Sequence, residues 1–119
     1  MDRQELGRFG EDQAARYLKR KGYTILERNY RRRGGEIDLI ARRRGFLAFV
    51  EVKLRKDAGH GEAREFVTAA KQEKLRLTAM LWLAEHETKL QPRFDVVEVY
   101  APQGAEGPVS IRHLEDAFQ

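Results

Sequence analysis

The chain has 119 residues and a formal net charge of +4, a length that suits one domain spanning residues 1–119 with a core that needs no disulfide or structural metal. It has no cysteine, which excludes disulfide scaffolds, cysteine-ligated zinc, iron–sulfur clusters and thiol nucleophiles. No apolar run reaches the ~20 residues of a membrane span, and the first residues are too charged for a signal peptide, so we expect a cytoplasmic protein without a membrane partner.

Helix and strand patterns follow one another along the chain. Apolar residues recur at three- and four-residue steps over residues 5–21, which predicts a helix. Aromatic and β-branched residues then predict three strands, the last two joined as a hairpin, at residues 23–31, 35–42 and 46–55. After a loop at 57–61, a second helix is predicted over residues 62–87, with a core-facing stripe of Phe66, Ala70, Leu77, Leu81 and Ala84. A fourth strand is predicted over 93–100, then a short strand and a helical turn within 108–118.

This order of elements predicts an α/β fold. The three successive strands should pair antiparallel, whereas the third and fourth are joined through a helix and should be parallel. We therefore expect a mixed β-sheet flanked by helices, with an α-β-β-β-α-β core.

Acidic residues interrupt two of the apolar strands. Because alternate residues of a strand share one face, Ile37 and Leu39 should face one way and Asp38 the other. In the next strand Glu51 and Lys53 should share a face. A hairpin that closes at residues 43–45 would set Asp38 beside Glu51, because the apolar faces of both strands must share the core.

This arrangement indicates a site for a cation. Carboxylates held a few ångströms apart repel, so one takes up a proton unless a cation lies between them. Mg²⁺ commonly uses one or two carboxylates and leaves positions for water and phosphate, and with Lys53 nearby this favours phosphodiester hydrolysis. The alternative is a salt-bridge ladder, which stabilises by roughly 0.2–1 kcal/mol per pair. Glu11 lies on the apolar stripe of the first helix, where it either pairs with Arg8 or Arg16 or leans toward the same site.

Positive charge is concentrated on the same third of the chain. Residues 16–56 hold fourteen basic and four acidic side chains, a net charge of +10, whereas the remainder holds nine basic and fifteen acidic ones, a net charge of −6. Such a patch is typical of proteins that bind a polyanion, and we expect a nucleic acid. Two triplets at the ends of the second strand either contact phosphates or form solvated turns: Arg31, Arg32, Arg33, Arg42, Arg43 and Arg44.

Asp38 followed by Glu51-Val52-Lys53 resembles the Asp…Glu-x-Lys signature of the restriction-endonuclease-like nucleases. Ile37 stands where that superfamily often has a proline. Five segments together resemble the bacterial YraN-like family over about residues 7–84: GRFGEDQAARYL, GYTILERNYR, GGEIDLIARR, FVEVKLR and KQEKL.

The resemblance implies a restriction-endonuclease-like fold and an Mg²⁺- or Mn²⁺-dependent endonuclease related to the archaeal Holliday-junction resolvases, with DNA, branched DNA included, as its partner. It implies that the catalytic residues are Glu11, Asp38, Glu51 and Lys53, and that Asp38, Glu51 and the carbonyl of Val52 hold the metal. Glu36 matches the YraN-like motif but has no fixed counterpart in the resolvases.

Further expectations concern the partners. Lys71 and Gln72 match positions where related nucleases hold a polar residue near the site, and we expect them and Arg55 to contact nucleic acid. Resolvases work as dimers, so a homodimer is also expected. The alternative function is a nucleic-acid-binding adaptor that retains the nuclease fold without turnover.

Overall fold

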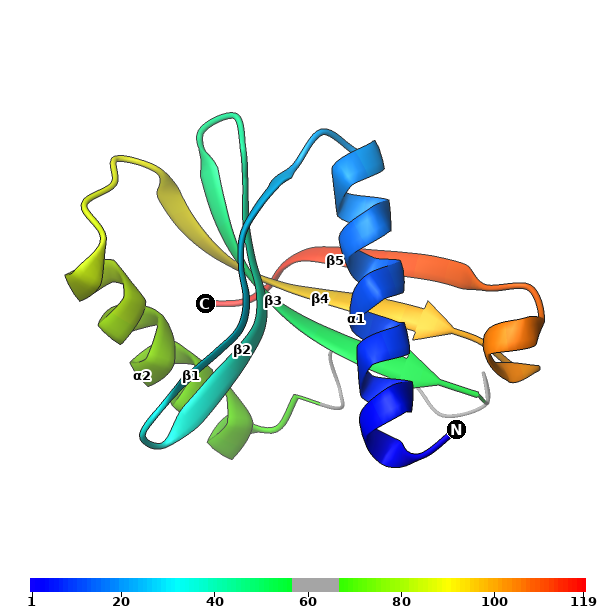
Figure 1. The fold of residues 1–119 in the computed structure, drawn as a ribbon. Coiled ribbons are helices and arrows are strands. Elements are labelled where there is room, and N and C mark those ends of the chain that lie inside the picture. Colours follow the sequence, from blue (N-terminus) through cyan, green and yellow to red (C-terminus); the bar gives the residue numbers. More distant parts are fainter. Residues whose placement is uncertain (57–66) are drawn as a thin grey trace.

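The computed structural model describes residues 1–56 and 67–119 (Figure 1). Among these residues, no helix is both long and apolar enough to cross a bilayer. The elements, in chain order, are α1 (Arg3–Arg20), β1 (Thr24–Arg32), β2 (Gly35–Arg43), β3 (Phe46–Arg55), α2 (Ala69–Glu85), β4 (Gln91–Tyr100), the 3₁₀ turn η2 (Gly104–Glu106) and β5 (Ser110–Phe118).

The five strands form one mixed sheet in the order β1-β2-β3-β4-β5. β1, β2 and β3 are antiparallel neighbours, and β3 and β4, which are joined through α2, are parallel. β5 then pairs antiparallel with β4. The α-β-β-β-α-β core predicted from the sequence is thereby confirmed, and it is the restriction-endonuclease-like arrangement.

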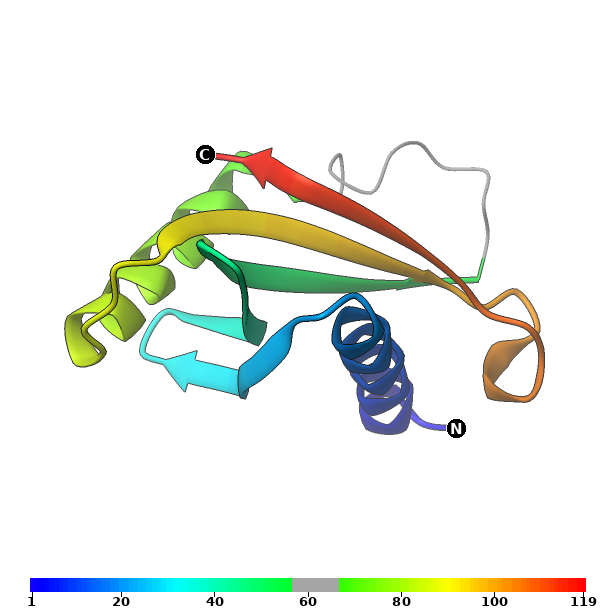
Figure 2. The ribbon, with the colours of Figure 1, turned by 90° about the horizontal axis from the view of Figure 1, so that it is seen from above.

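α1 and α2 cover opposite faces of the sheet (Figures 1 and 2). α1 begins with a capping box, in which the Asp2 carboxylate accepts a hydrogen bond from the Glu5 N–H at 2.8 Å. Thr68 caps the start of α2 in a similar way, through the Lys71 N–H. Each helix buries one stripe: Ala14, Ala15 and Leu18 in α1, and Leu75, Thr78, Ala79 and Trp82 in α2.

Two predicted elements differ from the structure. β5 is a strand over its whole length, where a short strand and a helical turn were expected. Without β5, β4 would be an edge strand with unpaired backbone groups. Pairing with β4 therefore overrides the local preference of the C-terminal segment for a helical turn. α2 begins at Ala69, later than predicted. The loop predicted at 57–61, and Phe66, lie outside the described residues.

The predicted core-facing stripe of α2 is also wrong. Leu77 and Leu81 are 54% and 44% exposed, whereas Leu75, Ala79 and Trp82 face the sheet. The helix carries apolar residues on both sides, so its sequence alone does not single out the buried side.

Candidate active site

β2 parts from β3 at Asp38. The pairing of these strands ends at Leu39 and Val50, and beyond it the Asp38 Oδ2 accepts a hydrogen bond from the Val52 N–H at 2.8 Å. Ile37 packs in the core under α2 while Leu39 packs in the core under α1, so the two do not share a face as alternation predicts. The Asp38 carboxyl therefore lies between the strands, where groups from both faces can reach it.

Asn29 of β1 lies across from this point, between the pairs Arg28–Leu39 and Tyr30–Ile37. Its φ of 53° is in the left-handed region, which asparagine tolerates better than most residues. This left-handed residue lies opposite the change of face in β2. The Asn29 side chain also hydrogen-bonds Glu11. Sequence reasoning missed Asn29, whose only signal is an asparagine inside a strand.

Three carboxylates gather on the α1 side of Asp38. Glu11 from α1 and Glu36 and Asp38 from β2 each place an oxygen within 4.8 Å of the others. Partial burial raises the pKa of Glu11; the hydrogen bond from Asn29 opposes this shift and the nearby Asp38 carboxylate adds to it. Glu36 also lies 3.2 Å from the Arg31 Nε. Glu36, whose role the motif left open, thus belongs to this cluster.

Glu51 approaches Asp38 from the α2 side. Its side chain is 15% exposed and lies 3.6 Å from the Lys71 Nζ. The oxygen of this ion pair, Oε2, is buried, and at this distance from the Lys71 ammonium it accepts no hydrogen bond from the described residues. The pKa of Asp38 is raised to about 7, first because the carboxyl is buried and then because the Glu51 carboxylate lies beside it.

These residues fit a hard divalent cation. The Glu51 Oε2 is buried with the Lys71 ammonium 3.6 Å away, and it lies beside a carboxyl whose pKa is raised by this neighbour; a divalent cation between the two carboxyls would relieve their repulsion. The donors are all oxygens, which suits Mg²⁺ or Mn²⁺. Asp38 and Glu51 are the residues placed to hold such an ion, and Val52 is fixed beside them through its N–H.

Lys53 is exposed and lines a cavity of about 300 Å³ together with Glu51. Lys71 and Thr68, from the start of α2, line the other side. Two lysines around one carboxylate can bind a phosphate group directly next to Glu51. Gln72 does not line this cavity; its Nε2 donates a hydrogen bond to the Val67 carbonyl at 3.1 Å and braces the start of α2.

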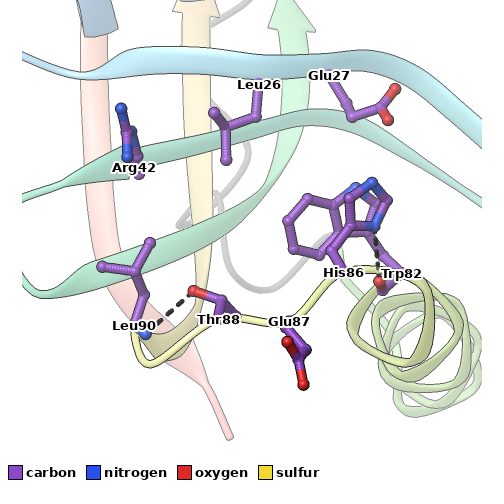
Figure 3. A pocket seen from close by; sticks show the side chains of 8 residues that line it. All are labelled: Leu26, Glu27, Arg42, Trp82, His86, Glu87, Thr88 and Leu90. Carbon is purple, nitrogen blue, oxygen red and sulfur yellow. Dashed lines mark hydrogen bonds between the residues drawn. The ribbon is translucent and has the colours of Figure 1, made fainter.

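The two arginine triplets occupy opposite ends of β2. Arg31 is 73% exposed and adjoins Glu36, so it lies beside the acidic cluster, whereas Arg32 pairs with Glu85 of α2 at 3.1 Å. Arg42, four residues beyond Asp38, lies about 13 Å from it along the strand. It lines a separate hollow of about 310 Å³ that also contains Trp82 and His86 (Figure 3). Of the arginines with printed contacts in the two triplets, Arg31 is therefore the one beside the candidate site.

Arg55 requires a correction. Its side chain is 9% exposed, and its Nη1 lies 2.7 Å from the Oε2 of Glu98, which is 11% exposed. A guanidinium held in a buried ion pair does not reach a surface-bound nucleic acid, so Arg55 does not belong to the expected contact surface.

Comparison with known proteins gives a consistent family. Residues 10–99 match the model of the "Uncharacterised protein family UPF0102". A UPF0102 protein of Rhodococcus opacus (strain B4) is 47% identical over 116 residues, which covers 95% of each chain. A UPF0102 protein of Syntrophotalea carbinolica is 48% identical over 117 residues, or 98% of this chain and 93% of the relative. The chain therefore belongs to the UPF0102 family, the YraN family that its motifs resemble.

Proposed function

We propose that this chain is a metal-dependent endonuclease that hydrolyses phosphodiester bonds of DNA, branched or junction DNA included. One observation carries the proposal: Asp38 lies where two strands part, between Glu11 on one face and the buried carboxylate of Glu51 on the other, and its pKa is raised by burial and by Glu51. A lysine-lined cavity adjoins Glu51 on its open side.

Each residue has a defined part in this proposal. Asp38 and Glu51 hold the cation, and the Val52 N–H fixes the orientation of Asp38. The Mg²⁺ or Mn²⁺ ion supplies Lewis acidity toward the phosphoryl group and the attacking water. Lys53 binds a non-bridging phosphate oxygen and offsets the charge that develops on it. Glu11 and Glu36, whose oxygens lie within 4.8 Å of an oxygen of Asp38, would position water on the α1 side.

Positively charged groups on two elements would hold the DNA backbone. The exposed Arg31 lies beside the acidic cluster, and Lys71 borders the cavity beside Glu51. Contacts of this kind fix the position of the DNA on the protein and carry no base specificity.

The test is cleavage of duplex, flap and four-way DNA with Mg²⁺ or Mn²⁺. Lys53→Ala should reduce cleavage about 100-fold or more, the usual effect of removing a charge-stabilising group. Lys89→Ala removes the same charge from an exposed position beyond α2 and serves as the matched control. Absence of cleavage on every substrate, or equal cleavage by Lys53→Ala and Lys89→Ala, would refute the proposal.

DNA-binding measurements with the same substrates distinguish the nuclease from the non-catalytic adaptor. An adaptor would bind DNA with a steep dependence on salt concentration, and its affinity would not change with the cation or with Asp38→Asn. The adjacent carboxyls of Asp38 and Glu51 favour the nuclease, since an adaptor gains nothing from burying two acids side by side.

A further inference from the structure

The α1 side of the candidate site holds a cavity to which the proposed function assigns no ligand. Its volume is about 420 Å³, and it lies between the start of α1 and the strands β1 and β2. Residues at steps of three and four share one face of a helix, and four such residues of α1 line the cavity: Gln4, Gly7, Arg8 and Glu11. The two strands contribute three more: Asn29, Arg31 and Glu36.

This cavity adjoins the place where DNA is proposed to be cut. Glu11 and Glu36 line it and also belong to the acidic cluster, in which an oxygen of each lies within 4.8 Å of an oxygen of Asp38. Asp38 thus has the lysine-lined cavity on one side and this cavity on the other. Because a DNA strand carries one phosphate per nucleotide, a strand whose scissile phosphate lies beside Lys53 would pass Asp38 and bring its next phosphate to the α1 side.

Arg8 is the cation available to a ligand in this cavity. It is exposed and makes no hydrogen bond or ion pair with another residue that the structure describes. Glu11, one of its expected partners, is instead hydrogen-bonded to Asn29. Arg31 is exposed as well, but its Nε lies 3.2 Å from Glu36. A guanidinium can donate two parallel hydrogen bonds to a phosphate, so Arg8 can bind one without first breaking an ion pair.

Gly7 leaves the space that a bound strand would need. It lies inside α1, where glycine destabilises a helix by about 0.5–1 kcal/mol relative to alanine. Packing within the fold does not account for it, because a Cβ at Gly7 would meet no atom within 4 Å. The glycine therefore widens the cavity beside Arg8 at a cost to the helix, which fits a role in binding a ligand.

We propose that this cavity binds the phosphate next to the scissile phosphate on the cut strand, and that Arg8 is the group that binds it. The inference rests on the proposed nuclease function and adds to it a backbone contact on the side of Asp38 away from Lys53 and Lys71. Arg8 is then a positioning residue, because a strand held on both sides of Asp38 leaves the scissile phosphate fewer positions. The contact carries no base specificity, as is usual for backbone contacts.

Binding of a fluorescent DNA duplex in EDTA tests the cavity without cleavage. Arg8→Ala should lower the affinity about tenfold and make the log–log salt slope less steep by about 1, because one phosphate contact is lost. Arg16→Ala removes the same charge from an exposed position two turns further along α1 and should change neither. Gly7→Leu should fill the cavity and weaken binding with an unchanged circular dichroism spectrum. Gly45→Leu, at another glycine where a Cβ would meet no atom within 4 Å, should bind as the natural chain does.

Cleavage of DNA that carries one methylphosphonate link identifies the phosphate, because this link replaces a charged oxygen by a methyl group. Next to the cleavage site, on one of its two sides, it should slow the natural chain about tenfold. It should not slow Arg8→Ala further, because both changes remove the same contact.

Two results overturn the inference. One is equal DNA affinity of Arg8→Ala and Arg16→Ala. The other is a methylphosphonate penalty that persists in Arg8→Ala or is absent on both sides of the cut. If no DNA is cut but Arg8→Ala and Gly7→Leu still weaken binding as expected, the nuclease function fails while the cavity stands as a phosphate site.

Discussion

Replacing Asp38 by asparagine should stabilise the protein when no divalent cation is present. Asparagine has nearly the same shape and can still accept the hydrogen bond from the Val52 N–H. It removes the charge whose pKa is raised from 3.8 to about 7 by burial and by the neighbouring Glu51 carboxylate. At about 1.4 kcal/mol per pKa unit, keeping Asp38 ionised costs at most about 4 kcal/mol of folding free energy.

The sign of the pH dependence follows from the direction of this shift. Below the unfolded-state pKa, near 3.8, Asp38 is protonated in both states and costs nothing. Above the folded-state pKa, near 7, it is ionised in both states and the full cost applies. The advantage of Asp38→Asn over the natural chain should therefore grow between about pH 4 and pH 7 and then stay constant.

The assay is urea unfolding in the presence of EDTA at several pH values, followed by the fluorescence of the single tryptophan, Trp82. Asp12→Asn is the control, because it makes the same chemical change at a carboxylate that is 51% exposed. Mn²⁺ should then stabilise the natural chain and leave Asp38→Asn unchanged, which reverses their order. A natural chain that is as stable as Asp38→Asn at pH 8 in EDTA would contradict the reasoning.

Three further outcomes are expected. In chemical denaturation, Gly35→Ala should destabilise the fold by about 1–3 kcal/mol, because the new Cβ would overlap the Thr78 Oγ1. Gly10→Ala is the control: a Cβ at this position would have its nearest neighbour at 3.5 Å. It should therefore be neutral or stabilise α1 by up to about 1 kcal/mol. Asn29→Gly, which keeps the left-handed backbone but loses the amide, should retain more Mn²⁺ affinity by calorimetry than Asn29→Ala, and equal losses would show that the left-handed backbone is unimportant. Burial alone would raise the pKa of Asp95, but the hydrogen bonds that it accepts lower the pKa overall. In thermal melts, Asp95→Asn should therefore be destabilised relative to the natural chain by its full amount at neutral pH, and this difference should shrink as the pH falls below about 4.

The strand pairing and the pairing of charges were predictable from the sequence. Alternation and the short link at residues 43–45 set the register of β2 and β3, and the register that the structure shows brings Asp38 to the level of Glu51. The break at Asp38 was not predictable, because strict alternation puts Ile37 and Leu39 on one face, whereas the structure puts them on opposite faces across from a left-handed Asn29, a conformation that many asparagines in strands do not adopt.

Two other features depend on tertiary contacts. α2 has apolar residues on two sides, and only the sheet decides that Leu75 is buried and Leu77 exposed. Asp95 is fully buried in β4 and lies 2.7 Å from the His113 Nε2, a pair that joins residues 18 positions apart. An aspartate inside the apolar run RFDVVEV was the available signal, but its partners on β5 could be found only once that segment was known to be a strand.

The position of Asp38 between two strands has a consequence for the behaviour of the whole fold. The layer under α1 and the layer under α2 are separate groups of side chains, divided by the sheet. Asp38 lies close to the Glu11 carboxylate on the α1 side of the sheet and to the Glu51 carboxylate on the α2 side. An ion held there would join β2 to β3 through Asp38 and Glu51, beyond the point where their backbone pairing ends, so separation of the two strands would require releasing it, and amide hydrogen exchange would slow in both strands together.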